Sequence, residues 1–523
     1  MNMIIYNVIT IVVTTLTCSA NHESLYIKNG LLIENATILT YNSKENFNSF
    51  KGYIAIDSSK IIYVGKNKPL VKGNFKVLKA EGKYVIPGLI DSHVHLANIA
   101  GMNVRHKMKH PDLAYEYFNQ LPKSFLYFGY TTLIDVNNYA PGLINNILQK
   151  EVRPDIYTCG EQVQIMNDFM MEMEEYSMEQ RYQMPFLYDH HNHNVSLPDS
   201  IKLETHTNKS IIRNIVEEQS GICIKVLYED ESSGMKVTWE KPSTEIINEL
   251  VQESKKYDAP VIIHAPSFEG QKFALETNID IIAHAMWNWS SDPLSLLDTT
   301  LTKAHKDLLN EFCKRKTGYQ PTFRAILGEI DILKETLLSD TIIEHIYSDN
   351  YLSWIKSDEG QWAKTRILNR PNFIKNTNPD FYYSVRKYFE TDEEMMKTIY
   401  ERLKIKINTV TNFLATNNAN LLFSTDGGAM NMYTTPPGYN GYLEMLHWYE
   451  AGVTLDKIFK AATFNCAEAF HLNNVIGTIE NDKIANLLIL NKNPLMDIEA
   501  YNNIDKVILH GNIINRSDLS AKK

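Results

Sequence analysis

The sequence predicts an α/β fold joined to a smaller β-domain, and three patterns along its 523 residues support this prediction. Short apolar runs alternate with helical stretches in the middle of the chain, as in parallel strands that are covered by helices. Short strands separated by turn residues fill residues 21–85, and the same pattern returns over residues 477–523. Because the two ends share this pattern, we expect them to form one β-sandwich beside a central α/β domain of residues 86–476.

The central domain contains four apolar runs that are the clearest candidates for buried parallel strands. They cover residues 131–136, 222–227, 260–264 and 279–284. Two segments break the alternation of strands and helices. Residues 323–411 mix charged and aromatic residues at helical spacing, which predicts a helical insertion. Residues 162–207 form a second insertion, which is rich in Met, Tyr and His.

The composition is that of a globular protein, with 44% hydrophobic and 22% charged residues. The formal net charge is −10, from 52 basic and 62 acidic residues. A nucleic-acid partner requires a basic face on the protein, so we expect no such partner. The sequence leaves the oligomeric state open, with a homo-oligomer among the options.

Residues 1–20 have the features of an export signal. The stretch from Met3 to Leu16 is mostly apolar and too short to span a membrane, and a cleavage position follows Ala20. The usual positive charges are missing, since no Lys or Arg precedes Lys28. We expect an exported protein, periplasmic or secreted, with no stable membrane span once the leader is removed. An uncleaved anchor and a cytoplasmic protein are the alternatives.

Four cysteines remain after removal of such a leader. None of them belongs to a CxxC pair: they are Cys159, Cys223, Cys313 and Cys466. We therefore expect buried free thiols and no disulfide framework.

His93 and His95 are the first candidate metal ligands. Side chains two residues apart on a strand point to the same side, roughly 6.5–7 Å apart, so two imidazoles there can close on one metal ion. Two ordinary polar strand residues are the alternative for a lone His-x-His pattern. The apolar run and the Pro87-Gly88 pair that lead into the two histidines favour metal ligation.

His264 and His284 are the second pair of candidate ligands. Each ends an apolar run and is followed by alanine, and a plausible helix, residues 268–276, lies between them. This spacing is one compact strand–helix repeat, so we expect the two histidines at equivalent heights on neighbouring parallel strands, about 4.8 Å apart. One satisfied core histidine in each strand is the alternative, but the matched contexts favour ligation.

Asp426 and Lys225 complete the candidate site. Asp426 ends an apolar strand and precedes two glycines, and a carboxylate is costly there unless a cation or hydrogen bonds compensate. A helix cap is the alternative for Asp426. Lys225 follows Ile222-Cys223-Ile224 in a strand that should be buried on both faces, where lysine is rare. It is either carbamylated by CO₂, which yields a carboxylate that bridges two metal ions, or it extends its amine out of the rim. Imidazoles with one carboxylate suit zinc or a similar divalent ion.

These motifs together resemble the amidohydrolase superfamily, most closely its imidazolonepropionase-like and prolidase-like members. The segments that carry the resemblance are residues 85–95, 129–135 and 424–428, together with the tail from Ala451 to Leu495. The resemblance covers most of the chain except the leader and the two insertions. It implies a (β/α)₈ TIM barrel whose active site lies at the carboxyl ends of the strands. It also implies that Asp426 holds metal, takes a proton from the attacking water and passes it to the leaving nitrogen.

The expected activity is metal-dependent hydrolysis of a C–N bond in an amide, a cyclic amide or a peptide-like small substrate. His93, His95, His264, His284, Asp426 and a carbamylated Lys225 would hold two ions, most naturally Zn²⁺. In a one-ion site, Lys225 is unmodified and His284 polarises the substrate. Deamination of a heterocycle by a one-ion site is the second hypothesis. A catalytically inactive scaffold or binding protein is the third, although such relatives typically lose ligands that are all present here.

Overall fold

The computed structural model describes residues 24–173, 176–334 and 336–522. The predicted export signal, residues 1–20, lies outside the described residues. Within the described part of the chain, no helix combines the length and the apolar character that a membrane span requires.

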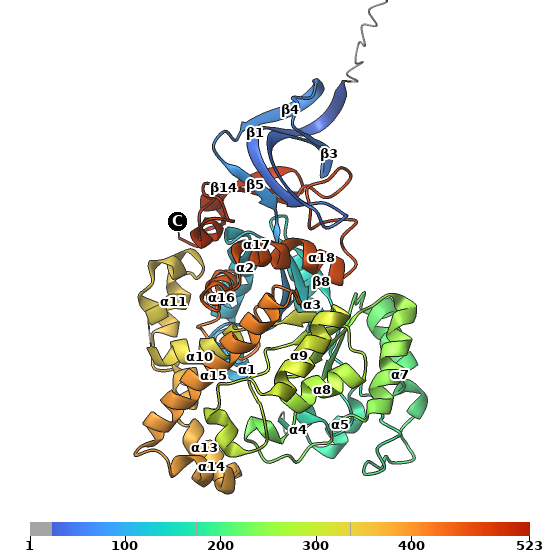
Figure 1. Cartoon of the computed structure of the whole chain (residues 1–523), viewed down its shortest axis with the longest axis vertical. Coiled ribbons are helices and arrows are strands. Elements are labelled where there is room, and N and C mark those ends of the chain that lie inside the picture. Colours follow the sequence, from blue (N-terminus) through green and yellow to red (C-terminus); the bar gives the residue numbers. More distant parts are fainter. Residues whose placement is uncertain (1–23, 174–175, 335, 523) are drawn as a thin grey trace, which may run out of the picture.

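Strands from both ends of the chain pair in one mixed sheet, at the top of Figure 1. The order is β16-β15-β14-β5-β1-β2-β3, with β4 paired to β1. The junction between the two ends is the antiparallel pairing of β5 with β14, in which Val85 faces Ile489. The strands are β1 (Leu25–Tyr41), β2 (Phe47–Asp57), β3 (Lys60–Gly65), β4 (Val71–Lys79), β5 (Tyr84–Pro87), β14 (Leu487–Leu490), β15 (Ile504–Leu509) and β16 (Asn512–Asn515).

Alternation of side chains explains why this sheet has its own core. Leu31 and Ile33 of β1 lie two residues apart on the same face, where they meet Ile54 and Ile56 of β2 and Ile508 of β15. Each of these five side chains is at most 1% exposed. A second small cluster, which contains Leu32, lies against β1 as well. The sheet is therefore stabilised by burial that requires both chain ends.

The central region contains two parallel sheets, and most of their strand residues are buried. One has the order β6-β7-β8, and the other has the order β9-β10-β11-β12-β13. Every residue of β6 and β7 is buried, which explains the continuous apolar runs in the sequence. The strands are β6 (Leu89–Val94), β7 (Tyr130–Asp135), β8 (Asp155–Thr158), β9 (Ile224–Leu227), β10 (Val261–His264), β11 (Ile281–Ala283), β12 (Gly318–Gln320) and β13 (Asn420–Leu421).

Backbone hydrogen bonds connect the two parallel sheets at both of their edges. On one side, the amide of Ser92 donates to the carbonyl of Phe423 at 3.0 Å, and the amide of Asp426 donates to the carbonyl of His93 at 2.9 Å. On the other side, the amide of Ile222 donates to the carbonyl of Thr158 at 2.8 Å. The segment after β13 thus continues beside β6 and brings the last strand to the first.

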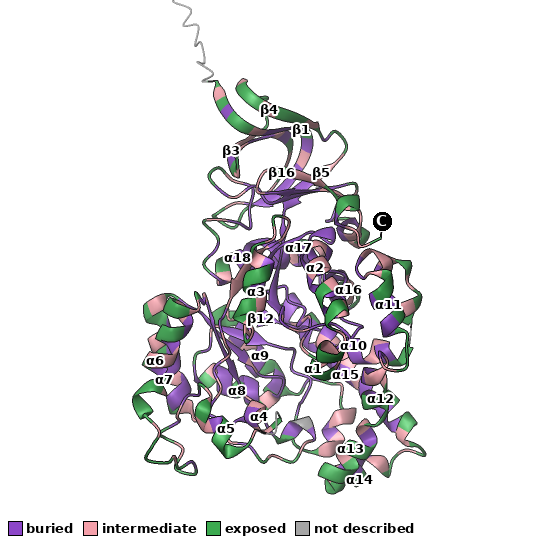
Figure 2. Cartoon of the chain, turned by 180° about the vertical axis from the view of Figure 1, so that it is seen from behind, coloured by how far each residue is buried: buried purple, intermediate pink, exposed green. Residues whose placement is uncertain are grey.

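Helices between successive strands cover these sheets, and Figure 2 shows buried strands in the interior with exposed helix faces around them. They are α1 (Val104–Lys109), α2 (Pro111–Tyr127), α3 (Pro141–Leu148), α6 (Asn208–Arg213), α7 (Thr244–Ser254), α8 (Phe268–Glu276), α9 (Lys303–Arg315), α16 (Tyr439–Glu450), α17 (Leu455–Lys460) and α18 (Cys466–Ala469). In α7, Ile246, Ile247, Leu250 and Val251 form a buried stripe, and Ser243 caps the helix by accepting from the amide of Ile246. Burying each such side chain is worth about 1.5–3 kcal/mol.

The two insertions interrupt the series of parallel strands after β12 and after β8. The segment between β12 and β13 contains α10 (Arg324–Lys334), α11 (Asp349–Ile355), α12 (Trp362–Leu368), α13 (Arg370–Thr377), α14 (Pro379–Arg386) and α15 (Asp392–Thr416). The segment after β8 contains α4 (Phe169–Met173) and α5 (Met178–Gln183). In Figure 1, α13 and α14 lie at the end of the molecule opposite the mixed sheet.

A disulfide joins Cys159 to Cys223, so the prediction of free thiols is wrong for this pair. Cys159 directly follows β8 and Cys223 directly precedes β9, and their Cα atoms lie 4.4 Å apart. The sequence separation of 64 residues hides this proximity, because only the folded sheets bring β8 beside β9. Cys313 and Cys466 are free, as expected.

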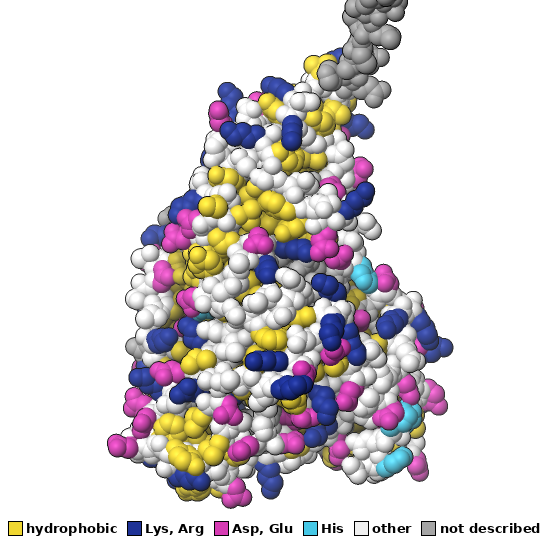
Figure 3. All heavy atoms as spheres, in the orientation of Figure 1, with side chains coloured by type: hydrophobic (Ala, Val, Ile, Leu, Met, Phe, Trp, Pro, Cys, Tyr) yellow, Lys and Arg dark blue, Asp and Glu magenta, His cyan; other side chains and the backbone are white. Residues whose placement is uncertain are grey.

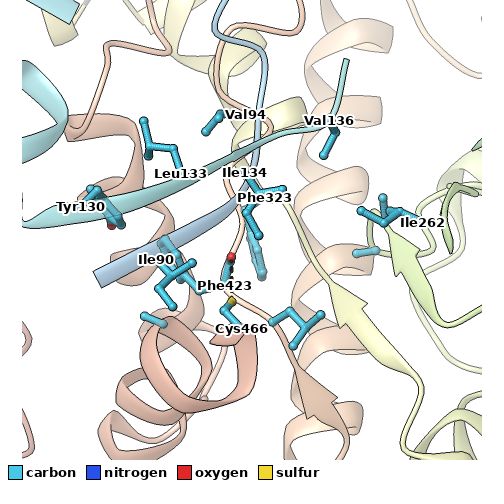
Figure 4. Packing of buried hydrophobic residues seen from close by; sticks show 14 of the residues in the cluster. Ile90, Val94, Tyr130, Leu133, Ile134, Val136, Ile262, Phe323, Phe423 and Cys466 are labelled. Carbon is cyan, nitrogen blue, oxygen red and sulfur yellow. Dashed lines mark hydrogen bonds between the residues drawn. The ribbon is translucent and has the colours of Figure 1, made fainter. Parts of the chain in front are cut away.

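The packed interior of the parallel sheets lies beneath the strand ends. Figure 4 shows Ile90, Leu133 and Phe423 among the side chains that meet there. The buried Cys466 donates its thiol hydrogen to the carbonyl of Phe423 at 3.5 Å. This dense apolar layer gives the polar residues at the strand ends a rigid base.

Candidate functional site

The first and last strands of the central region are tied together by Asp91. Its carboxylate accepts from the Thr425 amide at 3.1 Å, from the Thr425 hydroxyl at 2.7 Å and from the His93 amide at 3.3 Å. Asp91 is 1% exposed, and burial raises its pKa to about 7 even though these donors oppose the shift. This network fixes the backbone on which His93 and Asp426 stand.

His93, His95 and Asp426 converge at the carboxyl end of β6. The Nε2 atom of His95 lies 3.1 Å from Oδ1 of Asp426, and the Nε2 atom of His93 lies 3.3 Å from the same oxygen. The side chains of His93 and Asp426 are 1% and 8% exposed, whereas that of His95 is 14% exposed. The arrangement therefore has a buried interior and one partly open side.

Two of the six predicted site residues have left-handed backbones. The φ angle is 55° at Asp426 and 78° at His284. Such angles are uncommon outside glycine, and bulky residues adopt them only where the surrounding structure holds them. At Asp426, the amide donates to the His93 carbonyl, so the turn is held by the neighbouring strand. Both residues thereby turn at the strand ends, where the other candidate ligands lie.

Lys225 lies in the same cluster. Its Nζ atom is 3.5 Å from Nε2 of His93, and the residue is 3% exposed. Burial lowers the pKa of the amine to about 8, although the nearby Asp426 carboxylate opposes this shift. The amine therefore points into the site, which contradicts the alternative of a lysine that extends out of the rim.

His284 and His264 continue the cluster outward, but at different heights. In the register of β10 and β11, His264 pairs with Ala283. His284 therefore lies one residue beyond the position on β11 that is level with His264. The His284 ring is 5.5 Å from the His93 ring and 4.5 Å from the His264 ring, measured between centroids. His264 contacts Glu229, whose Oε2 lies 2.9 Å from its Nε2 atom. His284 thus links His264 to the inner group.

The charge states of the inner group suit a cation ligand set. Burial lowers the pKa of His93 to about 4, and the neighbouring Lys225 adds to this effect. Burial alone would raise the pKa of Asp426, but the imidazoles of His93 and His95 beside the carboxylate outweigh it and hold the pKa well below its usual value. At neutral pH, His93 is a neutral imidazole and Asp426 is an anion. Among the described residues, His93, His95 and Asp426 form a group whose ligand atoms all lie within 4.8 Å of one another.

Gln320 is a site residue that the sequence reasoning missed. It ends β12, is fully buried, and places Oε1 2.9 Å from Nδ1 of His93. Its amide nitrogen donates to the carbonyl of Ser92 at 3.0 Å and to the Ser92 hydroxyl at 2.9 Å. Because the Ser92 carbonyl can only accept a hydrogen bond, the amide nitrogen of Gln320 must face Ser92, and its oxygen must face His93. Nδ1 of His93 must then carry the hydrogen, so Nε2 presents its lone pair to the site.

Thr322 and Glu229 are two further residues that were missed. The hydroxyl of Thr322 lies 2.7 Å from Nδ1 of His284. Glu229 is 7% exposed, and its second carboxylate oxygen has no partner among the described residues. Glu229 lies just after the predicted buried strand of residues 222–227, and a glutamate there is the sequence signal that would have identified it. No strand is predicted before Gln320, so the sequence carries no such signal for that residue.

We expect Gln320→Leu to weaken metal binding about 10–100-fold. Without Gln320, nothing fixes the tautomer or the ring orientation of His93, the expected ligand. The substitution keeps the volume of the side chain but removes the acceptor for Nδ1 of His93. Metal affinity is measured by competition with a chromophoric chelator.

The control for this prediction is Gln320→Glu, which restores an acceptor for Nδ1 and should recover part of the affinity. A purely structural role for Gln320 would lower thermal stability in both variants and leave metal affinity unchanged in both. That result would remove Gln320 from the site.

Comparisons with known proteins place this geometry in a family. Two curated relatives match over short stretches: "Exoenzymes regulatory protein AepA" of Pectobacterium carotovorum subsp. carotovorum, 40% identical over 72 residues, and the adenine deaminase of Clostridium perfringens, 42% identical over 67 residues. Each match covers 13% of this chain, and the chain spans only 15% and 11% of the two relatives.

Similarity to solved structures extends over nearly the whole chain. A Xaa-Pro dipeptidase with bound methionine superposes with a TM-score of 0.57 at 18% identity, covering 93% of this chain and 99% of that one. At this level of identity, the likeness shows a shared fold. The model of the Amidohydrolase family matches residues 84–514, which is most of the chain and includes all six predicted site residues. The chain therefore belongs to the Amidohydrolase family.

Proposed function

We propose that this protein hydrolyses a C–N bond in an amide, a cyclic amide or a peptide-like small substrate, with a metal-activated water. The observation that carries the proposal is the convergence of His93 and His95 on one oxygen of Asp426, at the carboxyl ends of parallel strands. Family membership adds that relatives are metal-dependent hydrolases, and the dipeptidase that shares the fold acts on a peptide bond.

We further propose that the two parallel sheets are arcs of one (β/α)₈ barrel. Their eight strands β6 to β13 follow one another in sequence order, and the hydrogen bonds at both edges support closure. The barrel would comprise residues 86–476 with the helical insertion of residues 323–411. Residues 21–85 and 477–523 would form the composite β-sandwich. In such a barrel, the site lies at the face where barrel enzymes carry their chemistry.

The residues fit a divalent ion, and zinc is the natural choice for two imidazoles and a carboxylate. The ion would be held by His93, His95 and Asp426, and it supplies a lowered pKa for water together with positive charge near the substrate carbonyl. Asp426 accepts the proton of the attacking water as the C–O bond forms. When the C–N bond breaks, Asp426 gives this proton to the leaving nitrogen, so the carboxylate is regenerated.

The role of His284 depends on its tautomer, which Thr322 controls. If the Thr322 hydroxyl accepts from Nδ1, then Nε2 carries a lone pair, and His284 and His264 hold a second ion. If the hydroxyl donates to Nδ1, then Nε2 carries a hydrogen and polarises the substrate carbonyl instead. The same contact of 2.7 Å serves either arrangement.

Lys225 decides between these two versions in our proposal. Its neutral amine would attack CO₂, forming a C–N bond and releasing one proton to solvent, and the resulting carbamate would supply an anionic ligand for the metal ions. The buried amine beside His93 supports this step, since an unmodified ammonium would be desolvated there. Together with Asp426, a carbamate on Lys225 would provide a second anionic ligand beside His93, His264 and His284.

We expect about two divalent ions per chain, mostly zinc, to remain bound after exhaustive dialysis. Four histidines, Asp426 and a carbamylated Lys225 provide enough ligands for two ions. Elemental analysis measures the count, and labelled bicarbonate makes the carbamate visible by nuclear magnetic resonance.

One tightly bound ion per chain, with no carbamate signal, would contradict the two-ion version while leaving hydrolysis by a one-ion site in place. That outcome would favour the second candidate function, deamination of a heterocycle, which needs one ion and an unmodified Lys225. The short match to an adenine deaminase is the observation that keeps this alternative.

Export of the mature chain is also part of the proposal, with a cytoplasmic protein as the alternative. The buried disulfide between Cys159 and Cys223 supports export, because disulfides persist in oxidising compartments. Thiol titration of protein recovered from separated cell fractions tests this placement. In the unfolded mature chain, two reactive thiols match the oxidised pair. Four reactive thiols in the mature chain, or five in an uncleaved chain that keeps Cys18, contradict it.

The test of the function itself is an activity screen of zinc-loaded protein against dipeptides, N-acyl amino acids and cyclic amides, with heterocyclic amines as the deaminase arm. We expect hydrolysis of at least one amide class, abolished by chelation and restored by zinc. Turnover of a heterocyclic amine alone would favour deamination. No turnover above that of the Asp426→Asn variant would support the inactive scaffold.

A further inference from the structure

We infer that the protein has a second, separate metal site on its surface, built from His190, His191 and Glu249 and suited to Zn²⁺ or a similar ion. The two histidines lie in the insertion of residues 162–207, and Glu249 lies on α7. None of the three belongs to the candidate active site. In the sequence, the cluster from Asp189 to His193 is more typical of a solvated loop than of a site, and the structure changes this interpretation.

The three side chains converge on one point. The Nε2 atom of His191 lies 3.0 Å from Oε1 of Glu249, and the Nε2 atom of His190 lies 3.6 Å from the same oxygen. One ligand atom from each residue lies within 4.8 Å of the others. Two imidazoles and one carboxylate are the ligand set of many three-residue zinc sites, in which water completes the tetrahedron.

The two imidazole rings lie close together, with their centroids 4.0 Å apart. The Nε2 atoms of both rings face the same oxygen of Glu249. A simple ion pair of Glu249 with one protonated histidine leaves the other ring without a favourable role. A shared divalent cation satisfies both rings and the carboxylate.

The turn that carries the histidines is anchored to α7 by a buried aspartate. Asp189 is 3% exposed, and its carboxylate accepts from the amide of Ser243 at 2.7 Å and from the hydroxyl of Ser243 at 2.8 Å. The same carboxylate accepts from the amide of His191 at 3.1 Å. Since Ser243 is the N-cap of α7, this contact fixes the histidine turn relative to the helix that carries Glu249. The cluster is therefore preorganised.

Asn208 provides an independent indication of a ligand at this place. It is 8% exposed, its amide nitrogen donates to Oε2 of Glu249 at 3.4 Å, and its buried carbonyl oxygen has no partner among the described residues. Asn208, His190 and Glu249 line the same cavity of about 550 Å³, together with His206. A water bound to the ion would give this buried carbonyl a hydrogen-bond partner.

The surface around α7 carries side chains that can bind a cation. In Figure 3, histidine and acidic side chains gather at the lower right of the molecule, where Figure 1 places α7. Lys256 also lines the cavity and opposes cation binding, whereas Glu253 favours it. With three ligands and open access, the ion should exchange readily and bind more weakly than ions of the buried site.

The experiment is a zinc titration of the chelator-stripped, full-length protein, with a chromophoric chelator as competitor. We expect His190→Ala/His191→Ala to lose one zinc site relative to wild type, whatever number the active site holds. His193→Ala, a histidine in the same turn outside the cluster, should retain every site. Asn208→Ala should keep the site but weaken it about 10–100-fold, as expected for loss of a group that orients a ligand.

Glu249→Gln keeps the test valid if the double variant fails to fold. It removes the charge of Glu249 but preserves the size of this half-exposed side chain on α7. It should also lose the exchangeable site, while hydrolysis of any substrate found in the screen stays unchanged in all these variants. Equal zinc stoichiometry in wild type, in the double variant and in Glu249→Gln would overturn the inference. Loss of hydrolysis alone, with this site intact, would count only against the proposed function.

Discussion

Asp426→Asn should abolish nearly all turnover while the protein keeps much of its metal. Asparagine has about the same size and still offers an oxygen to an ion at the position where His93 and His95 converge. It cannot accept a proton from water at neutral pH, and that transfer is worth ~10²–10⁴ in rate. The measurement is kcat on a substrate from the screen, with metal content determined on the same sample.

The structure adds a pH dependence to this prediction. The pKa of Asp426 lies well below its usual value, because the effect of the adjacent His93 and His95 imidazoles outweighs the effect of burial. The carboxylate therefore stays ionised and active as the pH falls through the range in which ordinary aspartates begin to protonate. Turnover of Asp426→Asn within a few-fold of wild type would show that another group accepts the proton. Lys225 and His284 would be the next residues to test.

His264→Ala should lose metal and catalysis together without unfolding the protein. His264 ends β10, its side chain is 22% exposed, and its partners are His284 and Glu229 at the strand ends, away from the packed interior. Without His264, the second ion should no longer bind. Its loss should reduce transition-state stabilisation by about 3–4 kcal/mol, which lowers the rate by ~10²–10³. Circular dichroism, elemental analysis and kcat/KM on one preparation measure all three properties.

Ile263→Ala is the matched control, because Ile263 is the neighbouring residue on the same strand and is fully buried. Its truncation should lower stability by about 2–5 kcal/mol and leave the metal count unchanged in the folded protein. Normal metal content and full activity in His264→Ala would remove His264 from the site. The Glu229 contact would then be its whole role.

Much of the candidate site was predictable because its chemistry follows local rules. His93, His95, His264 and Asp426 lie at or just after the carboxyl ends of apolar strands, and parallel strands bring such ends to the same edge. Lys225 stood out because a lysine within a buried strand requires an explanation. The structure places these residues close to one another and to His284, and their roles are proposals.

What the sequence did not reveal depends on contacts between distant segments. Gln320 meets His93 only because β12 and β6 lie in the same folded interior, 227 residues apart along the chain. Cys159 and Cys223 pair for the same reason, across the edge between β8 and β9. The offset of His284 relative to His264 arises from register and a left-handed backbone angle, which residue types alone do not specify. The histidine turn of the insertion becomes a candidate site only when Asp189 anchors it to α7.

The most direct test of the central claim is anomalous X-ray diffraction from crystals of the zinc-loaded protein, recorded at the zinc absorption edge. We predict strong anomalous density among His93, His95 and Asp426, a second buried ion near His264 and His284, and a carbamate on Lys225. Density at the first position alone, with a plain Lys225 amine, would replace the two-ion site with a one-ion site. Zinc bound elsewhere, with none among His93, His95 and Asp426, would contradict the account.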